Sequence, residues 1–124
     1  MEDIRVLVVD DEAFNFEMLK VGLGDVFNLT YASSGQEALT MSLRESPQIV
    51  LLDICMPGLD GYDTCRLLKN TPETANIPII LLSGLESDNE VKEGYKAGCD
   101  DYITKPFEMA ELVNRIKSLS TNKG

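Results

Sequence analysis

The chain has 124 residues, 44% of them hydrophobic, which suits a single domain with one hydrophobic core. Its 21 acidic residues outnumber its 11 basic residues and give a net charge of −10, which argues against nucleic acid or an anionic membrane as a direct partner. The absence of histidine excludes histidine catalysis and histidine metal ligation. No apolar run approaches the ~20 residues that a membrane-spanning helix needs.

Five short apolar runs predict β-strands in chain order. They are Arg5–Val9, Asn28–Ala32, Ile49–Asp53, Ile77–Ser83 and Tyr102–Thr104. The third run is apolar up to its final carboxylate and is followed by Pro57 and Gly58, a pattern typical of a strand buried on both faces. The second run is the least apolar, so we expect it at an edge of the sheet.

Apolar residues at helical spacing predict a helix after each strand. The helical patterns cover Phe14–Leu23, Ser34–Leu43, Tyr62–Leu68, Ser87–Ala97 and Met109–Leu119. In the first of them Phe14, Met18, Leu19 and Leu23 form the apolar stripe. Ser34 and Ser87 each precede an acidic residue at capping-box spacing. The alternation of strands and helices predicts an α/β fold with a parallel sheet covered on both sides.

The three cysteines, Cys55, Cys65 and Cys99, are odd in number and show no C-x-x-C spacing. We interpret them as reduced thiols of a cytoplasmic protein, not as zinc ligands or disulfide partners. The acidic N-terminus leads straight into a strand, which argues against a signal peptide.

Polar side chains follow four of the five predicted strands. Asp10 and Asp11 end the first, Asp53 the third, Ser83 the fourth, and Lys105 the fifth. The carboxyl ends of parallel strands meet at one edge, so we expect these groups to converge. Three neighbouring carboxylates repel one another unless a cation intervenes, and an all-oxygen ligand set suits Mg²⁺.

A carboxylate beside a bound Mg²⁺ and a lysine can act as a nucleophile toward a phosphoryl group. Asp53 would then carry an acyl phosphate, with Lys105 and Ser83 stabilising the phosphoryl oxygens in flight.

Each of these residues taken alone has a simpler interpretation. An aspartate before a helix commonly caps it, Asp53 could be a solvated turn residue, and Ser83 and Lys105 could be surface groups. The occurrence of all five at the ends of alternate strands weighs against coincidence.

Four segments resemble the receiver domains of two-component response regulators. They are Val8–Glu12, Leu51–Gly61, Leu81–Gly84 and Gly98–Phe107, and the resemblance extends from about Ile4 to Leu119. It implies a flavodoxin-like (βα)5 three-layer sandwich with strand order 2-1-3-4-5. It also implies one receiver domain over residues 1–124, with a short tail at 120–124.

The resemblance assigns the metal ligands and the phosphoacceptor. Asp53 corresponds to the residue that takes a phosphoryl group from a histidine of a sensor kinase or phosphotransfer protein. Asp10, Asp11, Asp53 and the backbone carbonyl of Cys55 correspond to the ligands of Mg²⁺, for which Mn²⁺ can substitute.

The same resemblance assigns the switch. Ser83 matches the hydroxyl residue, Lys105 the essential lysine before a cis Pro106, and Tyr102 the aromatic residue that turns inward after phosphorylation. The signal would pass through the face formed by Asn89–Ala97, Tyr102–Thr104 and Met109–Ser118 to a partner, a fused output domain or a dimer.

Three alternatives stay open. The chain could be the receiver part of a longer regulator with a DNA-binding or cyclic-nucleotide-signalling output, or a degenerate scaffold that never takes phosphate. It could also be a Mg²⁺-dependent phosphatase with an aspartate nucleophile, although Cys55 stands where such enzymes usually have a second carboxylate. We expect a switch that catalyses only its own phosphorylation and dephosphorylation.

Overall fold

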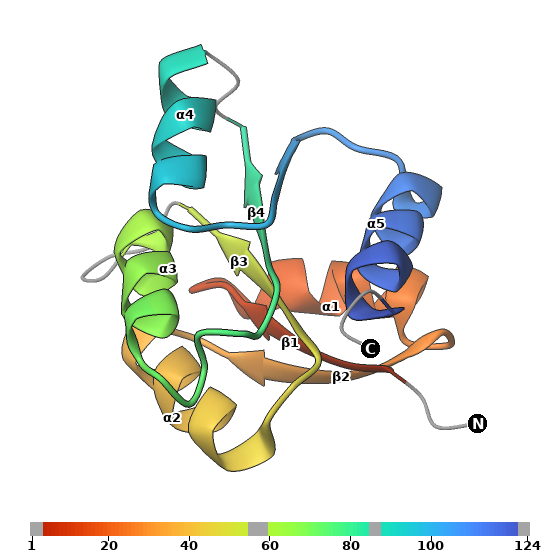
Figure 1. Ribbon diagram of the computed structural model, residues 1–124. Coiled ribbons are helices and arrows are strands. Elements are labelled where there is room, and N and C mark those ends of the chain that lie inside the picture. Colours follow the sequence, from red (N-terminus) through yellow and green to blue (C-terminus); the bar gives the residue numbers. More distant parts are fainter. Residues whose placement is uncertain (1–3, 55–59, 85–87, 122–124) are drawn as a thin grey trace.

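The computed structural model describes residues 4–54, 60–84 and 88–121, which form strands and helices in strict alternation (Figure 1). The strands are β1 (Ile4–Val9), β2 (Phe27–Ala32), β3 (Ile49–Asp53), β4 (Ile79–Ser83) and β5 (Asp101–Thr104). The helices are α1 (Ala13–Leu23), α2 (Gly35–Glu45), α3 (Gly61–Asn70), α4 (Asp88–Lys96) and α5 (Met109–Thr121).

The sheet is parallel throughout and has the order β2-β1-β3-β4-β5, which confirms the predicted fold. Every residue of β3 and β4 is buried, as the continuous apolar runs predict for central strands. The less apolar β2 lies at one edge, also as predicted. The central position of β3 places Asp53 at the middle of the sheet's carboxyl edge.

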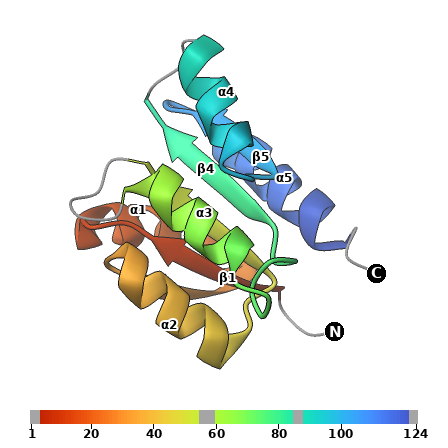
Figure 2. The same cartoon turned by 60° about the vertical axis from the view of Figure 1, so that its left-hand side comes forward.

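The two faces of the sheet are covered by different helices, as Figures 1 and 2 show. Alternate strand residues such as Val8 and Leu51 pack with Leu112 of α5 and Leu23 of α1. The residues between them pack against α2, α3 and the end of α4. Because side chains alternate along a strand, the apolar runs fill both layers of the three-layer sandwich at once.

Four strands begin one or two residues away from the predicted start, with β1 at Ile4 and β5 at Asp101 each one residue early. The second strand begins at Phe27, and the fourth begins at Ile79 instead of Ile77. The Ile77 amide donates to the carbonyl of Thr74, so this residue still belongs to the preceding turn. Pro78 has no amide hydrogen to donate to the ladder, so the strand starts after it.

The prediction that Phe14 and Met18 belong to the buried apolar stripe of α1 was wrong. Phe14 is 70% exposed and Met18 is 56% exposed, whereas Leu23 is buried. The inward face of the helix is formed instead by Phe16, Leu19 and Leu23, which pack against the cluster between the sheet, α1 and α5. Helix α1 therefore has an exposed apolar face as well as a buried one.

The start of α3 is held close to the end of β3. The Asp60 side chain caps the helix by accepting from the Asp63 amide (2.9 Å), and the Gly61 amide donates to the Ile54 carbonyl (2.8 Å). A Cβ atom at Gly61 would lie 2.4 Å from the Cα of Ile54, so only glycine allows this approach. The close contact fixes the chain that leaves Asp53.

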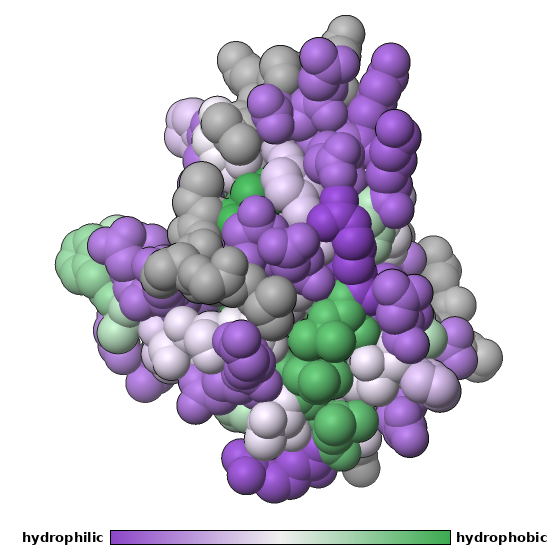
Figure 3. Space-filling view, turned by 90° about the vertical axis from the view of Figure 1, so that its left-hand side faces the viewer, coloured by the Kyte–Doolittle hydropathy of each residue, from purple (hydrophilic) through white to green (hydrophobic). Residues whose placement is uncertain are grey.

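The face formed by α2, α3 and α4 is mostly hydrophilic, with a narrow hydrophobic strip and smaller hydrophobic patches (Figure 3). Within the described ranges, none of the helices combines the length and the apolar character that crossing a membrane requires.

Candidate functional site

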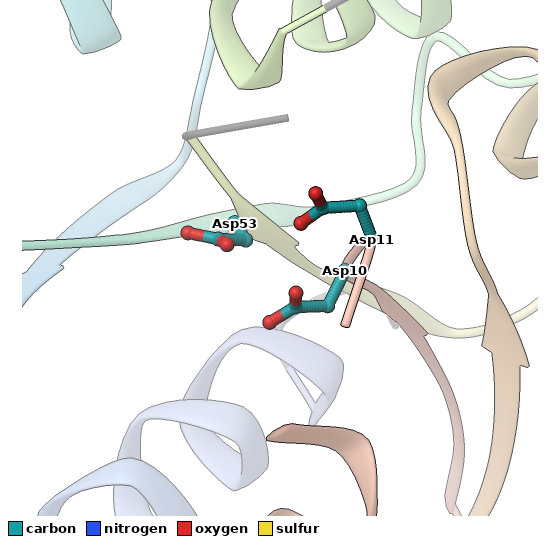
Figure 4. Close-up of side chains that lie close together, drawn as sticks. All are labelled: Asp10, Asp11 and Asp53. Atoms are coloured by element: carbon teal, nitrogen blue, oxygen red, sulfur yellow. The ribbon is translucent and has the colours of Figure 1, made fainter. Parts of the chain in front are cut away.

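Three carboxylates converge at the carboxyl edge of the sheet, just beyond β1 and at the end of β3 (Figure 4). One oxygen from each of Asp10, Asp11 and Asp53 lies within 4.8 Å of the others. Asp10 and Asp53 are buried, and Asp11 is exposed. The convergence follows from the register, since Val9 pairs with Leu52 and the next residue of each strand is an aspartate.

Asp10 is fixed by bonds to both its side chain and its backbone. Its two carboxylate oxygens accept from the Glu12 amide (2.9 Å) and from the Asn15 side-chain amide (3.1 Å). Its backbone amide donates to the Ala32 carbonyl (3.1 Å), and its backbone carbonyl accepts from the Tyr31 hydroxyl (2.7 Å). Glu12, not either aspartate, occupies the N-cap position of α1, so the simple capping interpretation does not account for the pair.

Lys105 supplies positive charge to the same edge. Its Nζ lies 3.5 Å from Oδ1 of Asp53. Its backbone amide donates to the Ser83 carbonyl (2.7 Å), which ties the loop after β5 to the end of β4. The Lys105–Pro106 peptide bond is cis, as the resemblance implied.

Ser83 lies at the same edge as Asp53, at the end of the neighbouring strand. It pairs with Thr104 in the β4–β5 ladder and is 1% exposed. The structure thus places all five strand-end residues at the carboxyl edge of the sheet, with Asp10, Asp11, Asp53 and Lys105 close together.

The electrostatics of the site favour a cation. Burial raises the pKa of Asp10, and the charge of Asp53 adds to that rise, against hydrogen bonds from Glu12 and Asn15 and the charge of Lys105. The ionised form of Asp10 is therefore held at a free-energy cost, which a divalent cation among the three carboxylates would relieve. Oxygen ligands at this spacing fit the preference of Mg²⁺. Cys55, the expected source of a further carbonyl ligand, lies outside the described residues.

Tyr102 is buried on the α2–α4 side of the sheet. It is 9% exposed, and a Cβ atom at Gly94 would lie 2.7 Å from its Cδ2. The tyrosine ring therefore packs under the backbone of α4. The sequence predicted that the side chain turns inward after phosphorylation, whereas it is already buried here.

Two residues of the site were missed in the sequence. Asn15 bonds to the Asp10 carboxylate, and Tyr31 bonds to the Asp10 carbonyl while its ring stacks on Phe16 with centroids 4.8 Å apart. Asn15, a polar residue between Phe14 and Phe16 in the first turn of α1, was a usable signal. Tyr31 carried none, because strand tyrosines are common and its contact with Asp10 is tertiary.

An apolar cleft of about 240 Å³ adjoins the carboxylates. Its walls include Met18 and Leu19 of α1, Phe107 in the loop after β5, and Met109 of α5, with Asp10 and Lys105 also lining it. The exposed Phe14 lies one helical turn before Met18 on α1, so the apolar surface continues beyond the cleft.

Comparison with protein families matches the response regulator receiver domain over residues 6–117. Among curated proteins, the response regulator PleD of Caulobacter vibrioides is 38% identical over 120 residues, which cover 96% of this chain and 26% of PleD. The DNA-binding response regulator MtrA of Mycobacterium tuberculosis is 40% identical over 115 residues, which cover 92% of this chain and 49% of MtrA. The chain thus spans between a quarter and a half of these relatives.

Among solved structures, the receiver domain of the Francisella response regulator 1452 superposes with a TM-score of 0.91. The two are 33% identical, and the alignment covers 98% of this chain and all of the Francisella chain.

Proposed function

Because the chain belongs to the receiver domain family of response regulators, we propose that it accepts a phosphoryl group on Asp53 and acts as a phosphorylation switch. One observation carries the proposal. Asp53 lies in a buried position beside Asp10 and Asp11, with the Lys105 ammonium 3.5 Å away. In this proposal Asp53 is the nucleophile, the three carboxylates form the cation site, and Lys105 supplies a positive charge beside them.

The transfer needs no general base, because the Asp53 carboxylate is the nucleophile in its ionised form. One of its oxygens bonds to phosphorus while the bond from phosphorus to the donor atom breaks, and the leaving group departs with the electron pair. Lys105 lies where it can neutralise charge on the transferred oxygens, and Ser83 is placed at the same edge to donate a hydrogen bond. The product is an aspartyl phosphate.

Asp10, Asp11 and Asp53 would hold Mg²⁺, with Mn²⁺ as a substitute. When bound, the ion supplies charge neutralisation for the incoming phosphoryl group. The backbone carbonyl of Cys55 completes the proposed ligand set by family resemblance.

The proposed phosphoryl donor is a phosphohistidine on a sensor kinase or phosphotransfer protein. Such a donor must bring its reactive nitrogen to Asp53, so its surface has to cover the surroundings of the site. Those surroundings are the apolar cleft with Met18, Met109 and Phe107, and the exposed face of α1 with Phe14. An amphipathic helix that carries the histidine is the occupant that fits an apolar groove ending at a charged site.

The proposed output is a change in the face formed by α4, β5 and α5, which would act on a partner protein, a second copy or a fused output domain. A fused output is supported by PleD and MtrA, which are both much longer than the region they share with this chain. We propose that residues 1–124 form one receiver domain, located in the cytoplasm, that catalyses only its own phosphorylation and dephosphorylation. The net charge of −10 argues against direct binding of nucleic acid by this part.

The experiment is incubation with acetyl phosphate and Mg²⁺, followed by intact mass measurement. We expect wild type to gain one phosphoryl group, and the gain to disappear in Asp53→Asn and in wild type with chelator. No gain in wild type would contradict the proposal. Steady release of phosphate from an added phosphomonoester would favour the phosphatase alternative instead.

A further inference from the structure

Two tyrosines from different layers of the fold meet beneath helix α4. Tyr62, in the first turn of α3, donates its hydroxyl proton to the backbone carbonyl of Glu90 in the first turn of α4, at 3.1 Å. Tyr62 also interacts with Tyr102 from β5, whose ring packs under Gly94 of the same helix α4, where a Cβ atom would lie 2.7 Å from its Cδ2. Tyr62 therefore links α3 to both α4 and the buried ring of Tyr102.

Tyr62 is partly buried and packs against the core cluster that contains Tyr102. Burial is the largest cause that raises the pKa of Tyr62, and its interaction with Tyr102 is the second. A phenol that keeps its proton in this way stays a hydrogen-bond donor over the whole physiological pH range.

Helices α3 and α4 are also joined one turn further along by an ion pair. Arg66 of α3 contacts Glu93 of α4 and Asp63 of its own helix. These side chains are 40–49% exposed, and exposed ion pairs contribute little to stability. The bond from Tyr62 to the Glu90 carbonyl is therefore the better candidate for holding α4 in place.

We propose that Tyr62 is a positioning residue that holds Tyr102 in its buried position before any phosphoryl group is bound. This inference rests on the proposed function, because Tyr62 would regulate the proposed phosphorylation switch. When most molecules already hold Tyr102 in the buried position, only a small population with an outward Tyr102 is left for phosphorylation to shift. Tyr62 thus sets how far the α4–β5–α5 face can respond.

The test is ¹⁹F NMR of protein labelled with 3-fluorotyrosine, in which the four tyrosines are assigned by single Tyr→Phe variants. In Tyr62→Phe without phosphodonor, we expect the resonance of Tyr102 to move toward its position in the unfolded chain. Loss of one hydrogen bond predicts a rise of about fivefold in the ratio of outward to inward Tyr102. An unchanged Tyr102 resonance would overturn the proposal.

Gly94→Ala supplies a reference for a displaced ring, because the added Cβ would contact Tyr102 at 2.7 Å. Tyr31→Phe is the matched control. It removes another tyrosine hydroxyl that donates to a backbone carbonyl, at Asp10 (2.7 Å), and should leave the Tyr102 resonance in place. A shift of Tyr102 in this control as large as that in Tyr62→Phe would refute a specific role for Tyr62.

Wild type gives a second readout should Tyr62→Phe fail to fold. Its hydroxyl proton at Tyr62 should exchange slowly and show a nuclear Overhauser effect to the Tyr102 ring, and a fast-exchanging proton would contradict the proposal.

Acetyl phosphate with Mg²⁺ should return Tyr102 to the buried position in Tyr62→Phe. Intact mass from the same samples reports whether Asp53 was phosphorylated, so failure of the proposed function stays separate from failure of this inference.

Discussion

Replacing Asp53 by asparagine should stabilise the protein in the absence of divalent cations. Taking the upper limit of 4.8 Å for the separation of the charges and an effective dielectric constant of about 20, each carboxylate repulsion amounts to about 3.5 kcal/mol. Asp53 takes part in two such repulsions and in one attraction, to Lys105 at 3.5 Å, worth about 4.7 kcal/mol on the same scale. The repulsions exceed the attraction by about 2 kcal/mol, and solvent screening at Asp11 and Lys105 reduces the expected gain to about 1 kcal/mol.

The assay is urea denaturation followed by circular dichroism at 222 nm, in EDTA and in Mg²⁺. In EDTA the variant should unfold at higher urea than wild type with the same slope. In Mg²⁺ at ten times its dissociation constant, wild type should gain about 1.4 kcal/mol and the variant much less. Adding Mg²⁺ should therefore reduce the difference in free energy of unfolding between Asp53→Asn and wild type, or make wild type the more stable protein.

Asp25→Asn is the matched control, because Asp25 is exposed and lies outside the acidic cluster. We expect its free energy of unfolding to stay within about 0.5 kcal/mol of wild type in both buffers. An Asp53→Asn variant that is less stable than wild type in EDTA would refute the reasoning that the acidic cluster is internally repulsive.

Three further predictions concern other parts of the fold. Lys69→Met should lower the free energy of unfolding by about 2–3 kcal/mol in urea denaturation. The reason is that the Lys69 Nζ donates to the Ile77 carbonyl (2.8 Å) and to the Asp100 carboxylate (2.9 Å). A loss below about 0.5 kcal/mol would contradict this prediction. Burial raises the pKa of Cys65 to about 11, so between pH 9 and 11 the folded state binds a proton that the unfolded state has lost. Stability should fall with rising pH in that window by up to about 1.4 kcal/mol per unit, and Cys65→Ala should flatten the slope; identical slopes would disprove the assignment. Tyr31→Phe should weaken Mg²⁺ binding by about fivefold in titration calorimetry, since it removes the bond that holds the Asp10 carbonyl, and an unchanged affinity would argue against that role.

The fold and the strand-end residues could be predicted because they depend on local patterns. The apolar run before Asp53 predicts a central parallel strand, and in a parallel sheet every carboxyl end lies at the same edge. The convergence of Asp10, Asp53 and Lys105 then follows from topology, without knowledge of any side-chain contact. The family resemblance supplied the strand order and the cis bond before Pro106.

The features that were missed depend on tertiary contacts or on an ambiguous periodicity. Phe14 and Met18 have the spacing of a core stripe, yet the helix turns Phe16 and Leu19 to the sheet instead. The bond from Tyr62 to the Glu90 carbonyl joins residues 28 positions apart, and nothing in the spacing predicts it.

The most direct test of phosphorylation at Asp53 is reductive trapping of the acyl phosphate. Protein treated with acetyl phosphate and Mg²⁺ is reduced with borohydride, which converts an aspartyl phosphate to homoserine, and is then mapped by peptide mass spectrometry. The account predicts homoserine at position 53 alone, and only when Mg²⁺ is present. Homoserine at another aspartate, or none at position 53 under conditions that phosphorylate a known receiver domain, would contradict it.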